Sequence, residues 1–374
     1  MKIIYVVNEA RFFISHRLPL GLAARDSGVE VVVVTAPDTG EEQLAKYGFR
    51  HISVPMSRSG FVLAQEIGAY RALRRIYREE RPDLVHHVTI KPVIYGSFAA
   101  RSCRVSAIVN AVPGMGFVFT RRGLKAALLR VGVNTLYRLA FASKSMRVIF
   151  QNSEDLRSFI DHGIVRREQT VLIRGSGVDL GLFDPRKEPP GPIKFVLVAR
   201  MLRDKGVLQF ARAAQRVKLA HPDWHFLLAG GTDSGNPTSL SEAQLRTLEQ
   251  EYGVEWLGHC TDIAGLLQGC HVAVLPTFYR EGVPKTLLEA SAAGLPMIAS
   301  DTAGCREVVT DGVTGLLVPP RMVEPLAQAM LLMGEDAQLR HRCGRAAREK
   351  AEAVFSVDDV VEHTFRIYEE LLQA

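Results

Sequence analysis

The sequence has few cysteines, no long apolar run and, over one long stretch, no acidic residue. Its five cysteines are odd in number and show no C-x-x-C or zinc-ligand spacing. This pattern indicates a reducing compartment and argues against a disulfide framework. No apolar run reaches the length that crosses a bilayer. We expect residues 1–8 to form a first strand and not a signal peptide, because their apolar run is short and polar residues interrupt it.

Acidic residues are missing between Asp83 and Glu154, a stretch that contains ten lysines and arginines. Residues 1–185 carry 26 Lys and Arg against 16 Asp and Glu, whereas the remainder carries 20 against 24. Such a positive field indicates an anionic partner: nucleic acid, a membrane surface or a phosphorylated ligand. Because no nucleic-acid-binding signature occurs, we expect no nucleic acid. Chance asymmetry on a solvated face is the alternative.

The length of 374 residues predicts about two domains. Apolar strands alternate with helical patterns over residues 2–162, which predicts a parallel sheet covered on both faces. Prolines mark a linker at 184–192, and a second alternation follows it. We therefore expect an α/β fold with domains over 1–185 and 193–355. Their ligands should bind at the carboxyl ends of the strands.

The segment 281–289 combines two glutamates eight residues apart with a Gly-x-Pro turn. A buried strand is predicted before it, over 271–276, and a helix after it, over 286–293. Glu281 therefore ends a loop at a sheet edge, and Glu289 lies about two turns into the helix. One carboxylate is suited to sugar hydroxyls and the other to a ribose. A solvated helix start is the alternative interpretation.

The turn between the two glutamates leads into the start of the helix. Pro284 suits a first helical turn, because its missing N–H is unpaired there anyway. The free backbone N–H groups at such a helix start favour an anion, most often a phosphate. We expect a ligand diphosphate beside Gly282, Val283, Pro284, Lys285 and Thr286.

Two further segments carry candidate binding residues. Arg200 ends a predicted strand and Lys205 opens the next helix, so the two cations can converge on one diphosphate. The pair Gly230 and Gly231 ends another strand and allows a backbone to approach a ligand closely. A charged surface loop and a tight turn are the respective alternatives.

Taken together, these segments resemble the retaining glycosyltransferases of family 4, which have the GT-B fold. The family's E-x7-E motif matches 281–289, its R-x4-K-G pattern matches 200–206, and its L-G-x-x-x-D loop matches 257–262, which contains His259. The resemblance implies two Rossmann-like domains that face each other across a cleft. A final helix over 356–374 would complete the first domain. Segments 299–307 and 311–319 also match and are expected to be turns beside the site.

The first domain resembles a subset of bacterial transferases that act on lipid-linked sugars, so the likeness covers nearly the whole chain. It shares the stretches at 15–19 (SHRLP), 85–92 (VHHVTIKP) and 110–117 (NAVPGMGF). The Gly-Gly pair that many relatives have after the first strand is absent, so no donor-phosphate contact is carried over to that loop. A loop through Phe13 is expected to precede a helix over 15–27. Four residues should face the cleft, because each ends a strand or opens a helix there: His16, Arg17, His87 and Lys91.

His87 is the residue that we expect near the donor sugar, because the family often has a histidine at the end of its fourth strand. His86 is the alternative, and for each histidine a purely structural role stays open. Farther along, the residues Arg121, Arg122 and Lys125 (the basic triplet) begin a helix with a narrow polar stripe. This helix start could lie at a membrane interface with its cations near phosphates. A core helix with one solvated edge is the alternative.

The resemblance implies a retaining transferase that moves an N-acetylhexosamine or hexose from a UDP-sugar to a polyprenyl-diphosphate-linked sugar. It would work in the cytoplasm, at the anionic inner face of the plasma membrane. No cofactor is expected, and no metal either, since the sequence has no D-x-D pair. Glu281 would hold sugar hydroxyls and Glu289 the ribose, while Arg200 and Lys205 would stabilise the leaving diphosphate.

Two rival functions share these features. A UDP-sugar epimerase of GT-B type has the same fold, but it does not account for the acid-free basic stretch. A non-catalytic nucleotide-sugar-binding scaffold is disfavoured by the intact glutamates and cations of the motifs.

Overall fold

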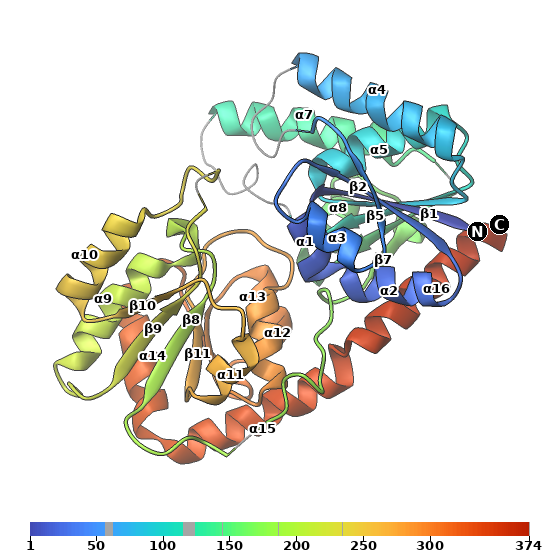
Figure 1. Ribbon diagram of the computed structural model, residues 1–374. Coiled ribbons are helices and arrows are strands. Elements are labelled where there is room, and N and C mark those ends of the chain that lie inside the picture. Colours follow the sequence, from blue (N-terminus) through green and yellow to red (C-terminus); the bar gives the residue numbers. More distant parts are fainter. Residues whose placement is uncertain (57–62, 115–123, 144, 186, 234, 374) are drawn as a thin grey trace. The chain divides into compact units, whose positions relative to one another are not determined.

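The computed structural model describes residues 1–374 except 57–62, 115–123, 144, 186, 234 and 374; the side chains of 63 and 124–128 are not described either. The chain divides into two compact units (Figure 1). Unit 1 comprises Met1–Ser176 and Val357–Ala374, and unit 2 comprises Gly177–Ser356. The proline-rich segment 184–192, expected as the linker, belongs to unit 2. Two contacts tie it there: Arg340 pairs with Glu188, and the His271 ring lies 3.0 Å from the Pro189 carbonyl oxygen.

Among the described residues of unit 1, seven parallel strands form one sheet in the order β3-β2-β1-β4-β5-β6-β7. They are β1 (Lys2–Glu9), β2 (Glu30–Ala36), β3 (Arg50–Ser53), β4 (Leu84–Val88), β5 (Ala107–Val112), β6 (Met146–Phe150) and β7 (Thr170–Leu172). The helices are α1 (Ala10–His16), α2 (Leu18–Asp26), α3 (Glu41–Lys46), α4 (Leu63–Glu80), α5 (Ile90–Ser102), α7 (Leu124–Ala140), α8 (Ser153–Asp161), the 3-10 turn η1 (Arg167–Gln169) and α16 (Val357–Gln373).

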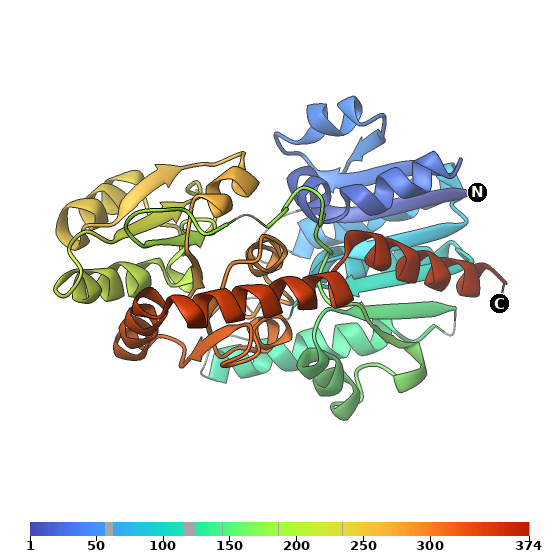
Figure 2. The same cartoon turned by 90° about the horizontal axis from the view of Figure 1, so that it is seen from below.

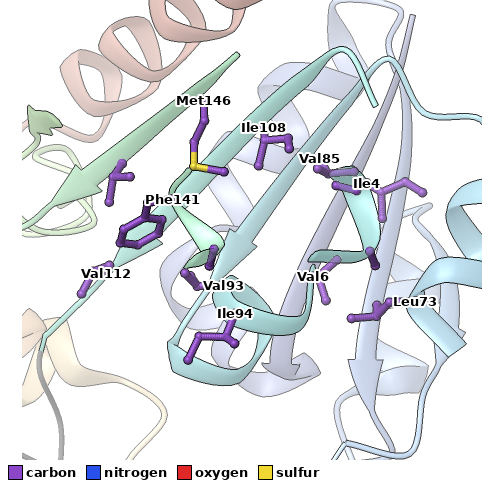
Figure 3. Packing of buried hydrophobic residues seen from close by; sticks show 14 of the residues in the cluster. Ile4, Val6, Leu73, Val85, Val93, Ile94, Ile108, Val112, Phe141 and Met146 are labelled. Atoms are coloured by element: carbon purple, nitrogen blue, oxygen red, sulfur yellow. The ribbon is translucent and has the colours of Figure 1, made fainter. Parts of the chain in front are cut away.

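Both faces of this sheet are buried, because successive side chains of a strand point to opposite faces. From β1, Ile4 and Val6 pack in a core with residues of α4, α5 and α7 (Figure 3). Their neighbours Ile3 and Tyr5 pack in a second core with α1, α2 and α16. The nearly continuous apolar strands that the sequence shows are therefore explained by a sheet covered on both sides.

The C-terminal helix α16 returns to unit 1, so both chain termini lie in this unit (Figure 2). Its buried residues Ile367, Tyr368 and Leu371 pack in the core shared with α2 and β1. Among the described helices of either unit, none combines the length and apolar character that a membrane crossing requires.

In unit 2, six parallel strands form a sheet in the order β10-β9-β8-β11-β12-β13 among the described residues. They are β8 (Lys194–Val198), β9 (His225–Ala229), β10 (Glu255–Gly258), β11 (Val272–Leu275), β12 (Met297–Ser300) and β13 (Gly315–Val318). The helices are the 3-10 turn η2 (Arg203–Lys205), α9 (Val207–Lys218), α10 (Glu242–Tyr252), α11 (Ile263–Gln268), α12 (Lys285–Ala292), α13 (Ala303–Val308), α14 (Val323–Glu335) and α15 (Ala337–Val354). Helices α9, α10 and α14 cover one face, and α11, α12 and α13 the other.

Local expectations were wrong at three places. The loop predicted through Phe13 is helical, because α1 begins at Ala10. The continuous helix predicted over 15–27 is interrupted at Arg17. Pro19 explains the interruption, since it has no N–H to donate to the carbonyl group of the preceding turn. The segments 299–307 and 311–319, expected as turns, contain α13 and β13.

Candidate active site

The strand order of unit 2 reverses direction between β8 and β11. From β8 the chain proceeds to β9 and β10 on one side, whereas β11 returns to the other side of β8. The loops after these two neighbouring strands therefore diverge, and such a switch point is where open parallel sheets bind ligands. Lys205 follows β8 and Glu281 follows β11, so the topology brings together residues 76 positions apart.

Lys205 and Glu281 form an ion pair at this switch point, with 2.6 Å between Nζ and Oε2. Both side chains are mostly buried, at 14% and 19% exposure. The other carboxylate oxygen of Glu281, Oε1, is buried and has no hydrogen-bond partner among the described atoms. Glu281 is thus held in place through one oxygen, while its second oxygen is an acceptor that a ligand hydroxyl can use.

The loops that carry this pair are bonded to each other. The carbonyl oxygen of Asp204 accepts hydrogen bonds from the backbone N–H groups of Phe278 and Tyr279, at 2.9 and 3.2 Å. Gly206 follows with φ +81°, and a Cβ there would lie 2.2 Å from the Pro276 carbonyl oxygen. Only glycine fits this close approach, which gives a physical reason for the glycine after Lys205.

Helix α12 begins beside Glu281. Pro284 is its N-cap and Lys285 its first helical residue, so the proline lies one position before the helical turn that the sequence predicted for it. Glu289 is 8% exposed, and its Oε1 lies 3.5 Å from the Lys285 ammonium. Burial raises the pKa of Glu289 above its ordinary value, and the nearby Lys285 opposes that shift.

Helix α13 packs against the loop that follows Glu281. A Cβ added to Gly304 would lie 1.8 Å from the Gly282 carbonyl oxygen and 2.8 Å from that of Glu281. The helix backbone therefore packs directly against the loop that carries the first glutamate. The sequence interpretation assigned Gly304 only to a turn, because nothing in the pattern places it under Gly282.

Arg200 lies at the same edge, 49% exposed, and its Nη1 donates a hydrogen bond to Asp233 Oδ2 at 2.6 Å. Sequence reasoning missed Asp233, although an acidic residue shortly after the Gly230–Gly231 pair was a usable signal. Arg200 and Lys205 thus each have an acidic partner within the loops that follow β8, β9 and β11.

Gly230 and Gly231 have different roles. Gly230 has φ +149°, and a Cβ there would lie 1.7 Å from the Ala199 carbonyl oxygen, so its glycine is required by packing between loops. At Gly231 an added Cβ would contact only the His259 side chain, at 3.6 Å or more. His259 is exposed and, with Gly231, borders the edge beyond β9 and β10.

In unit 1, the expectation that His87 faces a cleft was wrong. Its side chain is fully buried, with Nε2 2.9 Å from the Tyr77 hydroxyl and Nδ1 2.8 Å from Asn110 Oδ1. Helix α5 covers it, since a Cβ at Gly96 would lie 2.5 Å from the ring. Burial lowers the pKa of His87 to about 4. It is a neutral structural histidine with both ring nitrogens satisfied, and the alternative, His86, is buried as well.

Of the other unit 1 residues expected at the cleft, His16 is half-buried, and its ring stacks on Phe12 at 4.2 Å. Lys91 is mostly buried and forms an ion pair with Glu66 at 2.6 Å. Arg17 is 6% exposed. Two members of the basic triplet lie outside the described residues; the third, Lys125, lies in α7 with a side chain that is not described.

Among the described residues, no three His, Cys, Asp or Glu side chains are grouped as metal ligands.

Two parallel-sheet units in one chain form the fold of the GT-B class. Solved structures share the fold across the whole chain. The crystal structure of Anabaena Alr3699/HepE in complex with UDP has a TM-score of 0.79 at 19% identity and covers 99% of this chain and 100% of the other. Sucrose-phosphate synthase from Thermosynechococcus elongatus has a TM-score of 0.80 at 19% identity and covers 100% of both chains.

Comparisons with family models identify the family of the chain. Residues 182–350 match the model of glycosyl transferases group 1, and residues 2–152 match the glycosyl transferase 4-like model. The chain therefore belongs to the group 1 glycosyltransferases with a family 4-like N-terminal region.

Two curated relatives are similar over most of the chain. One is the N,N'-diacetylbacillosaminyl-diphospho-undecaprenol alpha-1,3-N-acetylgalactosaminyltransferase of Campylobacter jejuni, 26% identical with 100% of both chains covered. Another is the UDP-Gal:alpha-D-GlcNAc-diphosphoundecaprenol alpha-1,3-galactosyltransferase of Escherichia coli. It is 28% identical, and the alignment covers 78% of this chain and 76% of the relative.

Proposed function

We propose that this glycosyltransferase retains the donor's anomeric configuration. It moves an N-acetylhexosamine or a hexose from a UDP-sugar to a polyprenyl-diphosphate-linked saccharide during glycan or surface-polysaccharide assembly. The observation that carries the proposal is the Lys205–Glu281 pair at the switch point of unit 2, directly before α12. The names of the two relatives, both of which describe transfer to undecaprenyl-diphosphate sugars, support the acceptor class.

In this proposal the bond between the sugar C1 and the β-phosphate oxygen of UDP breaks, and C1 bonds to an acceptor hydroxyl oxygen. The acceptor proton passes to the leaving diphosphate, so no protein base is required. Lys205 and Arg200 stabilise the negative charge that develops on the diphosphate. Backbone N–H groups of Gly282, Val283, Lys285 and Thr286 contribute at the start of α12.

The two glutamates divide the recognition of the donor. Glu281 accepts hydrogen bonds from sugar hydroxyls through Oε1, the oxygen left free by Lys205. Glu289, farther along α12, accepts from the ribose hydroxyls. Gly231 and His259 border the donor on the side of β9 and β10.

The acceptor lipid requires the enzyme to work at a membrane surface. We propose that unit 1 approaches the anionic inner face of the plasma membrane through the basic triplet, in the cytoplasm. The acid-free stretch between Asp83 and Glu154 supports this orientation, because its excess of cations attracts anionic lipid. The reaction needs no metal or cofactor, since lysine and arginine side chains supply the positive charge at the diphosphate.

A donor screen tests the proposal. Purified enzyme is incubated with one UDP-sugar at a time and a synthetic polyprenyl-diphosphate N-acetylhexosamine, and the product is identified by mass. The expected product is heavier than the acceptor by one hexose or N-acetylhexosamine residue. Coupling constants from NMR should show the anomeric configuration of the donor. Conversion of the UDP-sugar into an epimer without transfer, or formation of the opposite anomer, would contradict the proposal.

A further inference from the structure

Arg17 is a buried cation without a carboxylate partner among the described residues. It joins α1 to α2 and is 6% exposed. Nη1 donates to the His16 carbonyl oxygen at 2.9 Å, whereas the buried Nε has no partner among the described atoms. Burial lowers the pKa of Arg17 to about 10, and the groups that oppose this shift are the Tyr368 and Tyr5 hydroxyls. A buried charge is costly unless an anion or further hydrogen bonds compensate for the lost hydration.

Another buried arginine shows how this protein usually satisfies such a group. Arg340 in unit 2 is 5% exposed, and it forms two hydrogen bonds with Glu188, at 2.8 and 2.9 Å. It also donates to the carbonyl oxygens of Met333 and Gly334. Arg17 has no such carboxylate among the described residues of unit 1, so the folded chain alone leaves its charge unbalanced.

The guanidinium borders a small cavity. Its lining includes Arg17, His86, Gly175, Ser176 and Thr364. The volume is about 20 Å³, which is room for one water-sized oxygen atom. Gly175 and Ser176 follow β7 at the carboxyl edge of the sheet, where parallel sheets bind their ligands. The cavity can therefore receive one oxygen of a larger group that lies at this edge.

His86 offers a second polar atom at the same cavity. Its Nδ1 lies 2.6 Å from the Tyr368 hydroxyl, and its buried Nε2 has no partner among the described atoms. Tyr368 donates its single hydroxyl proton to Tyr5 at 3.3 Å, so it accepts from the Nδ1–H of His86, and Nε2 of His86 carries a lone pair. The unused donor at this cavity is therefore the charged Arg17 guanidinium, which is the kind of group that an anionic oxygen requires.

We propose that Arg17 is the cation of an anion site in unit 1 that binds one oxygen of a phosphoryl group. A guanidinium suits this ligand because it remains charged when buried and matches phosphate geometry. The phosphoryl group has two possible sources, the diphosphate of the lipid-linked acceptor and free pyrophosphate. The first source rests on the proposed function, whereas the site itself does not.

Thermal unfolding with inorganic pyrophosphate tests the site without any substrate. Wild-type Tm should rise with pyrophosphate concentration, because a ligand that binds only the folded state stabilises it. In Arg17→Met the rise should be smaller than in wild type, because only the diphosphate site proposed in unit 2 remains. The Tm without pyrophosphate should equal or exceed that of wild type, because an apolar side chain of similar length replaces an unbalanced charge. Arg25→Met removes an exposed charge from α2, where Arg25 pairs with Asp26, and should leave the response intact.

Three results would overturn the site. The first is no rise of the wild-type Tm with pyrophosphate, and the second is an unchanged rise in Arg17→Met. The third is a large fall in the Tm of Arg17→Met while its rise with pyrophosphate is retained. If Arg17→Met does not fold, Arg17→Lys decides. It keeps the charge but loses the planar fork, so its response should be weaker than that of wild type, and an equal response overturns the site.

Kinetics then separate the two sources. If the phosphoryl group belongs to the acceptor, Arg17→Met should raise the acceptor KM about tenfold or more, because a hydrogen bond to a charged group is lost. The KM for the UDP-sugar should stay unchanged. An unchanged acceptor KM together with a reduced pyrophosphate response supports the site with free pyrophosphate as its ligand. If wild type transfers no sugar, the proposed function fails, and the thermal experiment still decides the site.

Discussion

Gly304→Ala tests whether the loop after Glu281 must keep its position. In the wild type, an added Cβ would lie 1.8 Å from the Gly282 carbonyl oxygen, whereas real Cβ contacts are essentially never shorter than 3.0 Å. Either the loop or α13 must therefore move by at least about 1.2 Å. A displacement of about 1 Å can lower a catalytic rate by roughly a hundredfold. We expect kcat/KM for transfer to fall by this order.

The assay is transfer from the UDP-sugar to the lipid-linked acceptor, with Tm measured on the same samples. Overpacking costs about 1–3 kcal/mol, so Tm should decrease by several degrees while the protein stays folded at the assay temperature. Gly269→Ala is the matched control in unit 2, because its Cβ would lie 3.5 Å from the nearest atom and its φ of −88° suits alanine. Wild-type kcat/KM in Gly304→Ala would refute the inferred role of α13 as the support of this loop.

Four further predictions concern the proposed reaction. Glu281→Ala and Lys205→Ala should each reduce kcat/KM about a hundredfold with the fold intact; activity within threefold of wild type, with circular dichroism as the folding control, contradicts the site. Transfer should survive EDTA, and a loss that Mg²⁺ or Mn²⁺ restores contradicts the metal-free mechanism. Reversal of the basic triplet to glutamate should weaken binding to anionic vesicles in a flotation assay, by about 1 kcal/mol per basic group. It should also raise the acceptor KM but not the donor KM. Unchanged flotation would contradict the membrane role and support the alternative, a solvated helix edge. Burial raises the pKa of Glu289 above its ordinary value. The stability that Glu289 contributes is therefore present below its pKa in the unfolded chain and is lost as pH rises through its pKa in the folded protein. Denaturant titrations of Glu289→Gln across this pH range should lack the loss, and a pH profile equal to that of wild type would contradict the prediction.

The sequence was sufficient for the alternation of strands and helices and for the position of the motifs. The apolar run Val31–Val34 reflects burial on both faces of the sheet, and the helical periodicity of α4 reflects burial of one helix face. Each pattern lies within a single segment. Glu281 was placed correctly after β11 and Glu289 within α12, because glycine, proline and a strand end are local signals. Glu289 lies about one turn into α12, and not the two turns expected.

The sequence misjudged residues whose surroundings come from distant segments. His87 looked like a site residue because it lies near a strand end, but Tyr77 and Asn110, from neighbouring elements, satisfy both its nitrogens. Gly304 looked like a turn glycine, although its role is set by the carbonyl oxygen of Gly282.

What the sequence determined by itself is therefore the fold class and the family. Hydrophobic periodicity and short motifs are written within a few consecutive residues. What only the tertiary structure decided is which charges are paired. The Lys205–Glu281 and Arg200–Asp233 pairs, and the unpaired guanidinium of Arg17, depend on how strands far apart in the chain are ordered in a sheet. That order follows from the packing of whole faces, which no short segment encodes.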